Sequence, residues 1–196
     1  MALKLRVKLG GVNNLSDARY AAGMGVEAIG FGIDKEQQGF LDPEAMHAIS
    51  DWIAGIEIVG ETDSNLPENL EEYKLDILEV KDTNLLGNDK KYLLRLTADN
   101  DNIDQLPHLF KTNVDLVEYF MVDIEASDLA ELGQDLKLLA EIYPIFIATS
   151  FDAYNLHYVL EVIQPQGIEL KGGMEEKPGL SSYDGIAYIL ELLEED

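Results

Sequence analysis

Short apolar segments alternate along this chain with longer segments of helical periodicity. The first apolar segment, residues 3–9, places apolar side chains on one face of a strand and basic side chains on the other. The apolar set is Leu3, Leu5, Val7 and Leu9, and the basic set is Lys4, Arg6 and Lys8. A Gly10-Gly11 turn then leads into the helical pattern LSDARYAAG, which predicts a strand, a turn and a helix rather than a hairpin.

The same unit recurs to the end of the chain. Strands are predicted at residues 3–9, 26–31, 56–61, 76–81, 92–97, 117–123, 144–148 and 167–171. Helices are predicted at residues 15–23, 42–54, 66–73, 103–111, 127–142, 153–163 and 183–193, with a poorly defined turn or helix at 83–88. Eight units in 196 residues leave about 24 residues for each. We therefore predict an α/β protein, a single (β/α)8 TIM barrel of minimal length formed by residues 1–196, with a doubly wound open sheet as the alternative.

The charge of the chain restricts its partners. With 14 basic and 38 acidic residues, its formal net charge is −24. Nucleic acids and anionic membrane surfaces bind basic faces, so neither is an expected partner. The chain has no cysteine, its three histidines are not spaced as metal ligands, and it holds no run of signal-peptide or membrane-spanning character. We expect a cytoplasmic protein with no disulfide and no metal, and the oligomeric state, a homodimer included, stays open.

Candidate site residues follow from the predicted barrel, in which ligands meet the carboxyl ends of the strands. Those positions are Gly10, Gly11, Asp34, Glu61, Lys81, Asp123, Thr149, Ser150, Lys171, Gly172 and Gly173. Strand alternation also turns charged side chains toward the barrel axis, namely Arg6, Lys8, Glu57, Glu79, Lys81, Glu169 and Lys171. Buried charges need partners, so these side chains either pair with one another as a polar core or support an upper layer that faces a ligand. That upper layer would be Lys81, Asp123 and Lys171.

The loops after the last two strands are candidates for a phosphate site. Gly172 and Gly173 let backbone N–H groups approach an anion, and Thr149 and Ser150 follow the preceding strand. An ordinary turn is the alternative for the glycine pair. Asp152, at the predicted start of a helix, is expected to be an N-cap rather than an acid catalyst.

Four blocks of the sequence share the order and spacing of motifs in a known family. They are VKLGGVNNLSDA at residues 7–18, IGFGIDKEQQGFLDPEAM at 29–46, YFMVD at 119–123 and GIELKGGMEEKPG at 167–179. Together they resemble phosphoribosylanthranilate isomerase of tryptophan biosynthesis, a (β/α)8 enzyme. The resemblance is thin between residues 85 and 115.

The resemblance implies an Amadori-type isomerisation of an aminoaldose to an aminoketose, without a cofactor. It assigns the general acid to Asp123. The position of the family's catalytic cysteine is Gly10, and the position of the arginine that binds the anthranilate carboxylate is Gly39. Neither glycine can replace those functions, so the resemblance implies weak or no standard activity. Asp34 is a conceivable replacement base.

Three functions therefore compete. The first is a diverged relative that keeps a site for a phosphorylated, sugar-like ligand, formed by Gly39, Thr149, Ser150, Gly172 and Gly173. The second is a working enzyme, either the isomerase or one that uses Lys81 or Lys171 as an amine nucleophile with Asp123. The third is a non-catalytic barrel that binds another protein.

Overall fold

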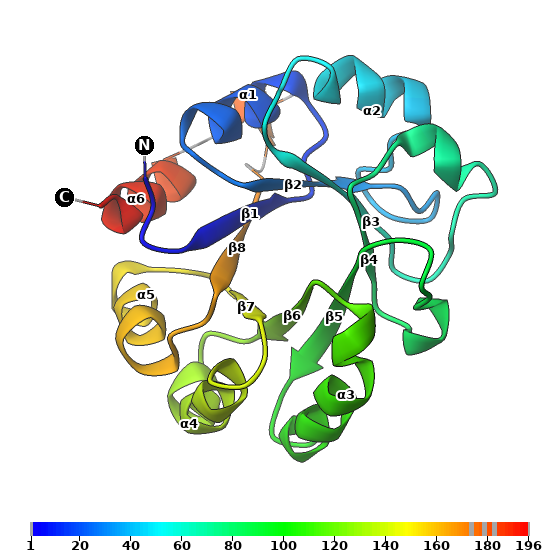
Figure 1. Cartoon of the computed structure of the whole chain (residues 1–196). Coiled ribbons are helices and arrows are strands. Elements are labelled where there is room, and N and C mark those ends of the chain that lie inside the picture. Colours follow the sequence, from blue (N-terminus) through cyan, green and yellow to red (C-terminus); the bar gives the residue numbers. More distant parts are fainter. Residues whose placement is uncertain (1, 173–174, 178–179, 182–183, 196) are drawn as a thin grey trace.

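The protein is a closed barrel of eight parallel strands in the order β1 to β8, in which β8 pairs with β1 (Figure 1). The computed structural model describes residues 2–172, 175–177, 180–181 and 184–195. The barrel strands are β1 Arg6–Gly10, β2 Ala28–Gly32, β3 Glu57–Glu61, β4 Ile77–Val80, β5 Tyr92–Ala98, β6 Tyr119–Ile124, β7 Ile145–Ala148 and β8 Gly167–Lys171. The predicted barrel is confirmed, and the open-sheet alternative is wrong.

Helices surround the barrel on most of its circumference, as Figure 1 shows. The α-helices are α1 Leu15–Gly23, α2 Pro43–Ser50, α3 Leu106–Asn113, α4 Leu129–Ala140, α5 Ala153–Tyr158 and α6 Asp184–Leu193. Five shorter helical segments accompany them, namely η1 Leu70–Tyr73, η2 Thr83–Leu85, η3 Ile103–Gln105, η4 Val114–Leu116 and η5 Val159–Ile163. A two-stranded antiparallel sheet, β9 Glu175–Lys177 with β10 Leu180–Ser181, lies between β8 and α6. None of the helices in the described ranges is long and apolar enough to span a bilayer.

The third and fourth units differ from the prediction. We expected a helix at residues 66–73 and a turn or helix at 83–88, but the structure has only the 3-10 segments η1 and η2 there. Lys74 ends η1 in the left-handed conformation at φ 52°, which terminates the helical run. This side of the barrel is therefore covered by loops and single turns.

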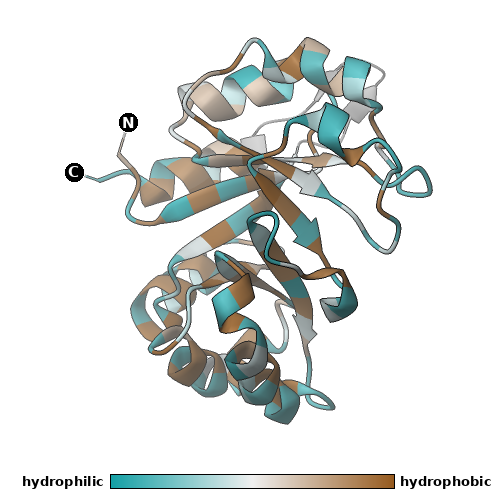
Figure 2. Ribbon diagram, turned by 45° about the vertical axis from the view of Figure 1, so that its right-hand side comes forward, coloured by the Kyte–Doolittle hydropathy of each residue, from teal (hydrophilic) through white to brown (hydrophobic). Residues whose placement is uncertain are grey.

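The side chains on the two faces of the strands form an outer core and an inner core. Residues such as Val7, Leu9, Ile29 and Phe31 point outward and pack against the helices in one large buried cluster. The alternate positions point inward and form a separate apolar cluster of Ala28, Val59, Ile77, Leu93, Tyr119, Met121, Phe146 and Ala148. Alternating hydrophobic and hydrophilic residues along the strands are visible in Figure 2. Charged residues share the inner face with this cluster.

Helix caps and the chain termini fix the ends of several units. Asn14 caps α1 by accepting a hydrogen bond from the N–H of Asp17, and Asp152 forms a capping box with Asn155 at α5. The N-cap role predicted for Asp152 is thus confirmed. Near the termini, the N–H of Lys4 donates to the carbonyl of Leu193 at 2.8 Å, which ties the start of the chain to α6.

A candidate site at the mouth of the barrel

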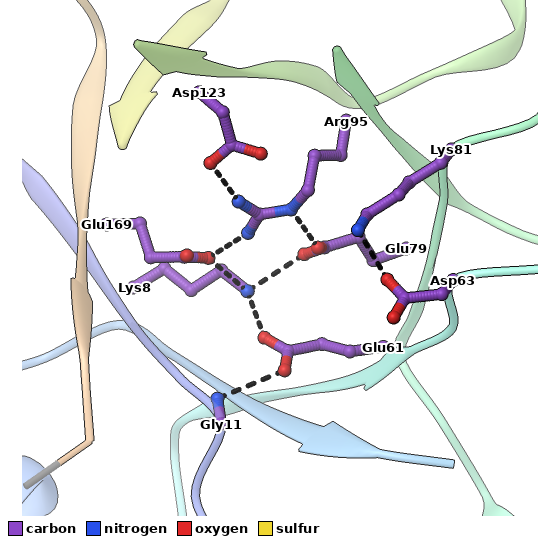
Figure 3. A network of polar contacts seen from close by, with 9 residues as sticks. All are labelled: Lys8, Gly11, Glu61, Asp63, Glu79, Lys81, Arg95, Asp123 and Glu169. Carbon is purple, nitrogen blue, oxygen red and sulfur yellow. Dashed lines mark hydrogen bonds and ion pairs between the residues drawn. The ribbon is translucent and has the colours of Figure 1, made fainter. Parts of the chain in front are cut away.

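The ammonium group of Lys8 lies among three glutamates inside the barrel (Figure 3). Its Nζ is 2.5 Å from Glu169 Oε2 and 2.8 Å from Glu79 Oε2, and it also pairs with Glu61 Oε1. Lys8 is fully buried. An ammonium group has three N–H donors, so the three carboxylates match its capacity.

Arg95 extends this cluster toward the mouth. Its guanidinium pairs with Glu79 through Nε and with Glu169 through Nη2, and its Nη1 donates to Asp123 Oδ1 at 2.6 Å. These six residues, Lys8, Glu61, Glu79, Arg95, Asp123 and Glu169, form what we call the interior network. They come from β1, β3, β4, β5, β6 and β8, so the network connects six of the eight barrel strands.

The network shifts the pKa values of its members in different directions. Burial alone would lower the pKa of Lys8, but the three glutamates outweigh it and raise that pKa well above its ordinary value. Burial would raise the pKa of Glu79, but Lys8 and Arg95 lower it to about 2. At Glu61 and Asp123 burial dominates, and their pKa values are raised despite the nearby cations. Glu79 is therefore firmly ionised, while Glu61 and Asp123 hold protons more readily than ordinary carboxyl groups.

Two glycines leave room for the carboxylates. A Cβ at Gly30 would overlap the carboxylate of Glu61, and a Cβ at Gly10 would lie 2.9 Å from Glu61 Oε1 and 3.0 Å from Glu169 Oε2. The N–H of Gly11 donates to Glu61 Oε2 at 3.0 Å. The space beside Gly10 thus holds two carboxylates, whereas the sequence alone gave no proton acceptor at that position.

Three carboxylates of the network have a spacing that could hold a cation. The ligand atoms of Glu61, Glu79 and Glu169 lie within 4.8 Å of one another. The ammonium of Lys8 already occupies the centre of this group and supplies the positive charge. The arrangement is therefore an internal ion cluster.

Some predicted interior charges lie elsewhere. Arg6 and Glu57 pair with each other at 3.1 Å at the opposite, amino-terminal end, where Arg6 also stacks near the rings of Tyr119 and Phe146. Lys81 was expected to face the axis, but it follows the last residue of β4 and forms a half-exposed ion pair with Asp63. Lys171 ends β8 and is exposed. Of the expected upper layer, Asp123 pairs with Arg95 of the network and Lys81 pairs with Asp63 instead; that this layer faces a ligand stays a prediction.

Asp34 has a different role from the one considered for it. Its carboxylate accepts hydrogen bonds from the backbone N–H groups of Glu36, Ser64 and Asn65 and joins the loops after β2 and β3. The N–H of Glu36, followed by those of Asn65 and Ser64, lowers the pKa of Asp34. A carboxylate stabilised in this way is a weak base.

The other predicted ligand-binding residues lie at the same end of the barrel. Thr149 and Ser150 directly follow β7, and the N–H of Gly172 donates to the carbonyl of Gly10 at 2.8 Å. Gly39 has a φ of +82°, which favours glycine. Gly173 lies outside the described residues. Gly10, Asp123 and Gly172 are linked at this end of the barrel. The N–H of Gly172 bonds to Gly10, whose α-carbon faces Glu169, and Glu169 shares Arg95 with Asp123.

Sequence reasoning missed Arg95. Its strand, YLLRLT, has leucines on both faces, so alternation does not show which face is inside. The signal was the single charge in an otherwise apolar strand, which needs a buried partner in a barrel that offers several acidic residues.

Comparison with known proteins finds one kind of enzyme that this chain is similar to. No family model matches the sequence. The chain is 22% identical over 205 residues to the N-(5'-phosphoribosyl)anthranilate isomerase of Chloroherpeton thalassium, and the match covers 95% of this chain and 94% of that protein.

Solved structures of enzymes with the same name have a fold similar to that of this chain. The phosphoribosyl anthranilate isomerase of Thermotoga maritima has a TM-score of 0.79 at 16% identity, and that of Thermus thermophilus has a TM-score of 0.71 at 23% identity. Each comparison covers 95% of this chain and 97% of the other. The chain is thus similar to an N-(5'-phosphoribosyl)anthranilate isomerase in sequence over nearly its full length and to solved isomerases of that kind in fold.

Proposed function

We propose that this barrel binds a phosphorylated, sugar-like small molecule at the carboxyl end of its strands and has weak or no standard Amadori isomerase activity. The similarity to isomerases of this kind supports the ligand class, since a similar enzyme is solved in complex with reduced 1-(o-carboxyphenylamino)-1-deoxyribulose 5-phosphate. The substitutions Gly10 and Gly39 support the loss of standard activity. A cytoplasmic location and a homodimer belong to the same proposal, and gel filtration tests the dimer.

The observation that carries the proposal is that two oxygen atoms in loops after barrel strands are buried and lack a partner. Gln37 Oε1, in the loop after β2, and Thr149 Oγ1, after β7, have no hydrogen-bond partner among the described residues. A Cβ at Gly32, the last residue of β2, would lie 3.3 Å from Gln37 Oε1. An unsatisfied buried polar group costs about 1–3 kcal/mol. A hydroxyl group of a bound ligand is a partner of the kind that each oxygen lacks.

The standard reaction is disfavoured by the state of the groups beside Gly10. Both carboxylates there, Glu61 and Glu169, are paired with Lys8, and Glu61 also accepts from the N–H of Gly11. The residue at position 39 has no side chain to pair with an anthranilate carboxylate. A missing general base alone removes a factor of about 10²–10⁴ in rate.

A thermal-shift titration with ribose 5-phosphate and a turnover assay with N-(5'-phosphoribosyl)anthranilate test the proposal. We expect the sugar phosphate to raise the melting temperature, as a ligand selective for the folded state must, and turnover to be weak or undetectable. The variant Thr149→Val should lose part of the shift without a loss of stability. Thr112→Val on α3, whose hydroxyl donates to the carbonyl of His108, is the matched control and should keep the full shift.

Two results would contradict the proposal. Absence of any shift with sugar phosphates would remove the ligand site and favour a barrel that binds another protein. Turnover at the rate of an ordinary isomerase, or complementation of a strain that lacks the enzyme, would show that the standard activity survives.

A further inference from the structure

Two exposed aliphatic side chains lie together on the outside of the barrel. Leu138 is in α4 and Ile142 directly follows that helix, and the two residues are 59% and 71% exposed. Residues four apart are neighbours on a helix surface. The leucines of α4 that are buried against the barrel are different ones, namely Leu129, Leu132, Leu136 and Leu139. Leu138 and Ile142 therefore form a second apolar edge, which no described part of the chain covers.

This apolar edge borders a hollow between α4 and α3, which are neighbours in Figure 1. Leu138 and Ile142 line the hollow together with Pro107 of α3. Leu139 and Tyr143 line it as well, and the ring of Tyr143 packs edge-on against Phe110 in the core at a centroid distance of 5.4 Å. Part of the lining is thus fixed by the core, so the hollow exists before any partner binds.

The size of the hollow favours a protein partner over a small molecule. Its volume is about 250 Å³. Small-molecule sites usually have about 300–1,000 Å³ and enclose most of the ligand. An apolar surface patch with a polar rim is instead typical of a contact with another protein. The hollow suits a few apolar side chains that project from a partner.

The charge around the hollow indicates the chemistry of that partner. Asp104 and Asp135 line it, and its described lining residues include no lysine or arginine. The adjoining segments, residues 96–110 and 125–136, contain acidic residues but no lysine or arginine either. A basic partner is attracted to such a surface, and the formal net charge of −24 acts in the same direction.

A second copy of this chain does not suit the hollow. A two-fold contact through this face would bring Asp104 and Asp135 of one copy against the same residues of the other. Like charges in contact disfavour association, and each copy also carries the same large negative charge. The occupant is therefore a different chain with basic residues.

We propose that the hollow between α3 and α4 is a docking site for a basic amphipathic helix of another protein. Apolar side chains of the partner helix pack against Leu138 and Ile142, as a helix does in an apolar groove. Lysines or arginines beside them pair with Asp104 and Asp135. The site is on the outside of the barrel, so it does not depend on the ligand proposed for the mouth.

Fluorescence anisotropy with a labelled leucine–lysine peptide of about 18 residues, long enough to form a helix, tests the site. Its leucines recur at every third and fourth position, which gives the helix one apolar face and one basic face. We expect saturable binding to the native chain and none by the same peptide with glutamate in place of lysine. Leu138→Gln and Ile142→Gln should each weaken binding about tenfold, since each removes an apolar side chain that becomes buried. Asp135→Asn should weaken it about two- to fivefold.

Leu66→Gln and Glu44→Gln are the matched controls. Leu66 is 37% exposed in the loop after β3, Glu44 is exposed in the first turn of α2, and neither lines the hollow. Both variants should bind the peptide with native affinity. All five variants change exposed side chains, so their melting temperatures should stay close to that of the native chain. The peptide should also slow amide hydrogen exchange in α3 and α4.

Three results would overturn the docking site. The first is absence of peptide binding, and the second is binding that the three variants at the hollow leave unchanged or that the controls weaken equally, which would mean attraction by net charge alone. The third is a dimer of the native chain in sedimentation velocity that Ile142→Gln abolishes, which would assign the hollow to a second copy. None of these results affects the sugar phosphate site, which the thermal shift tests separately.

Discussion

Replacement of Lys8 by methionine is the most direct test of the interior network. The change keeps most of the side-chain volume and removes the ammonium group that three carboxylates share. One oxygen atom from each of these carboxylates lies within 4.8 Å of the others in the native chain, and Lys8→Met leaves Arg95 as the remaining cation of the described network. Folding must then either bury uncompensated negative charge or bind protons.

The expected loss is large because Lys8 is fully buried. Removal of one partner from a buried ion pair costs about 3–5 kcal/mol. For a chain of this length, each kcal/mol corresponds to about 2–4 °C, so the melting temperature should fall by about 6–20 °C at pH 7.5. The glutamates in the variant have pKa values above those of the unfolded chain, so stability returns as the pH falls through those values. The return is about 1.4 kcal/mol per pH unit for each proton bound.

Urea and thermal unfolding followed by circular dichroism at pH 5.0, 6.0 and 7.5 measure both effects. Lys81→Met is the matched control, because Lys81 pairs with Asp63 at the surface and should contribute at most about 1 kcal/mol. A double variant, Lys8→Met with Glu61→Gln, should regain part of the lost stability. The reasoning fails if Lys8→Met loses no more than the control, or if its deficit is the same at pH 5.0 and 7.5.

Three further changes test single features by the free energy of unfolding. Gly30→Ala should cost about 1–3 kcal/mol, since its Cβ would displace the Glu61 carboxylate, whereas Gly23→Ala, with open space at its Cβ, should be neutral or stabilising. Asp152→Ala should lose about 1 kcal/mol with the capping box of α5. Asp34→Asn should lose about 1–3 kcal/mol at pH 7 and little at pH 3. The pKa of Asp34 is lowered in the folded chain, so its ionised carboxylate stabilises the fold at pH values above the pKa of the unfolded chain. That stabilisation disappears as the pH falls and the carboxylate is protonated. An equal effect of Asp34→Asn at both pH values would contradict its role as an ionised acceptor.

The strands could be predicted from sequence because period-two alternation and turn residues mark them directly. The alternation at residues 6–8 and 57–61 also predicted that Lys8 lies inside the barrel. Residues 66–73 have helical composition, but the structure forms only the 3-10 segment η1 there. The local pattern does not show how many residues are needed to connect β3 to β4.

The candidate site was less predictable. Parity along a strand places a side chain inside, but it does not give the height at which the side chain lies. Lys81 and Glu79 have the same parity, yet Lys81 follows the end of its strand and turns to Asp63, whereas Glu79 is buried. Which acid pairs with which base depends on the stagger of eight strands, and sequence spacing does not contain that information.

The tight space beside Gly10 and Gly30 has a consequence for how this protein can change. Any side chain at position 10 would require the carboxylates of Glu61 and Glu169 to shift, and a shift of Glu61 would disturb an ion pair of Lys8. Residues 8, 10, 30 and 61 are therefore constrained to vary as a set. Substitutions at these four positions are therefore expected to be non-additive in the free energy of unfolding.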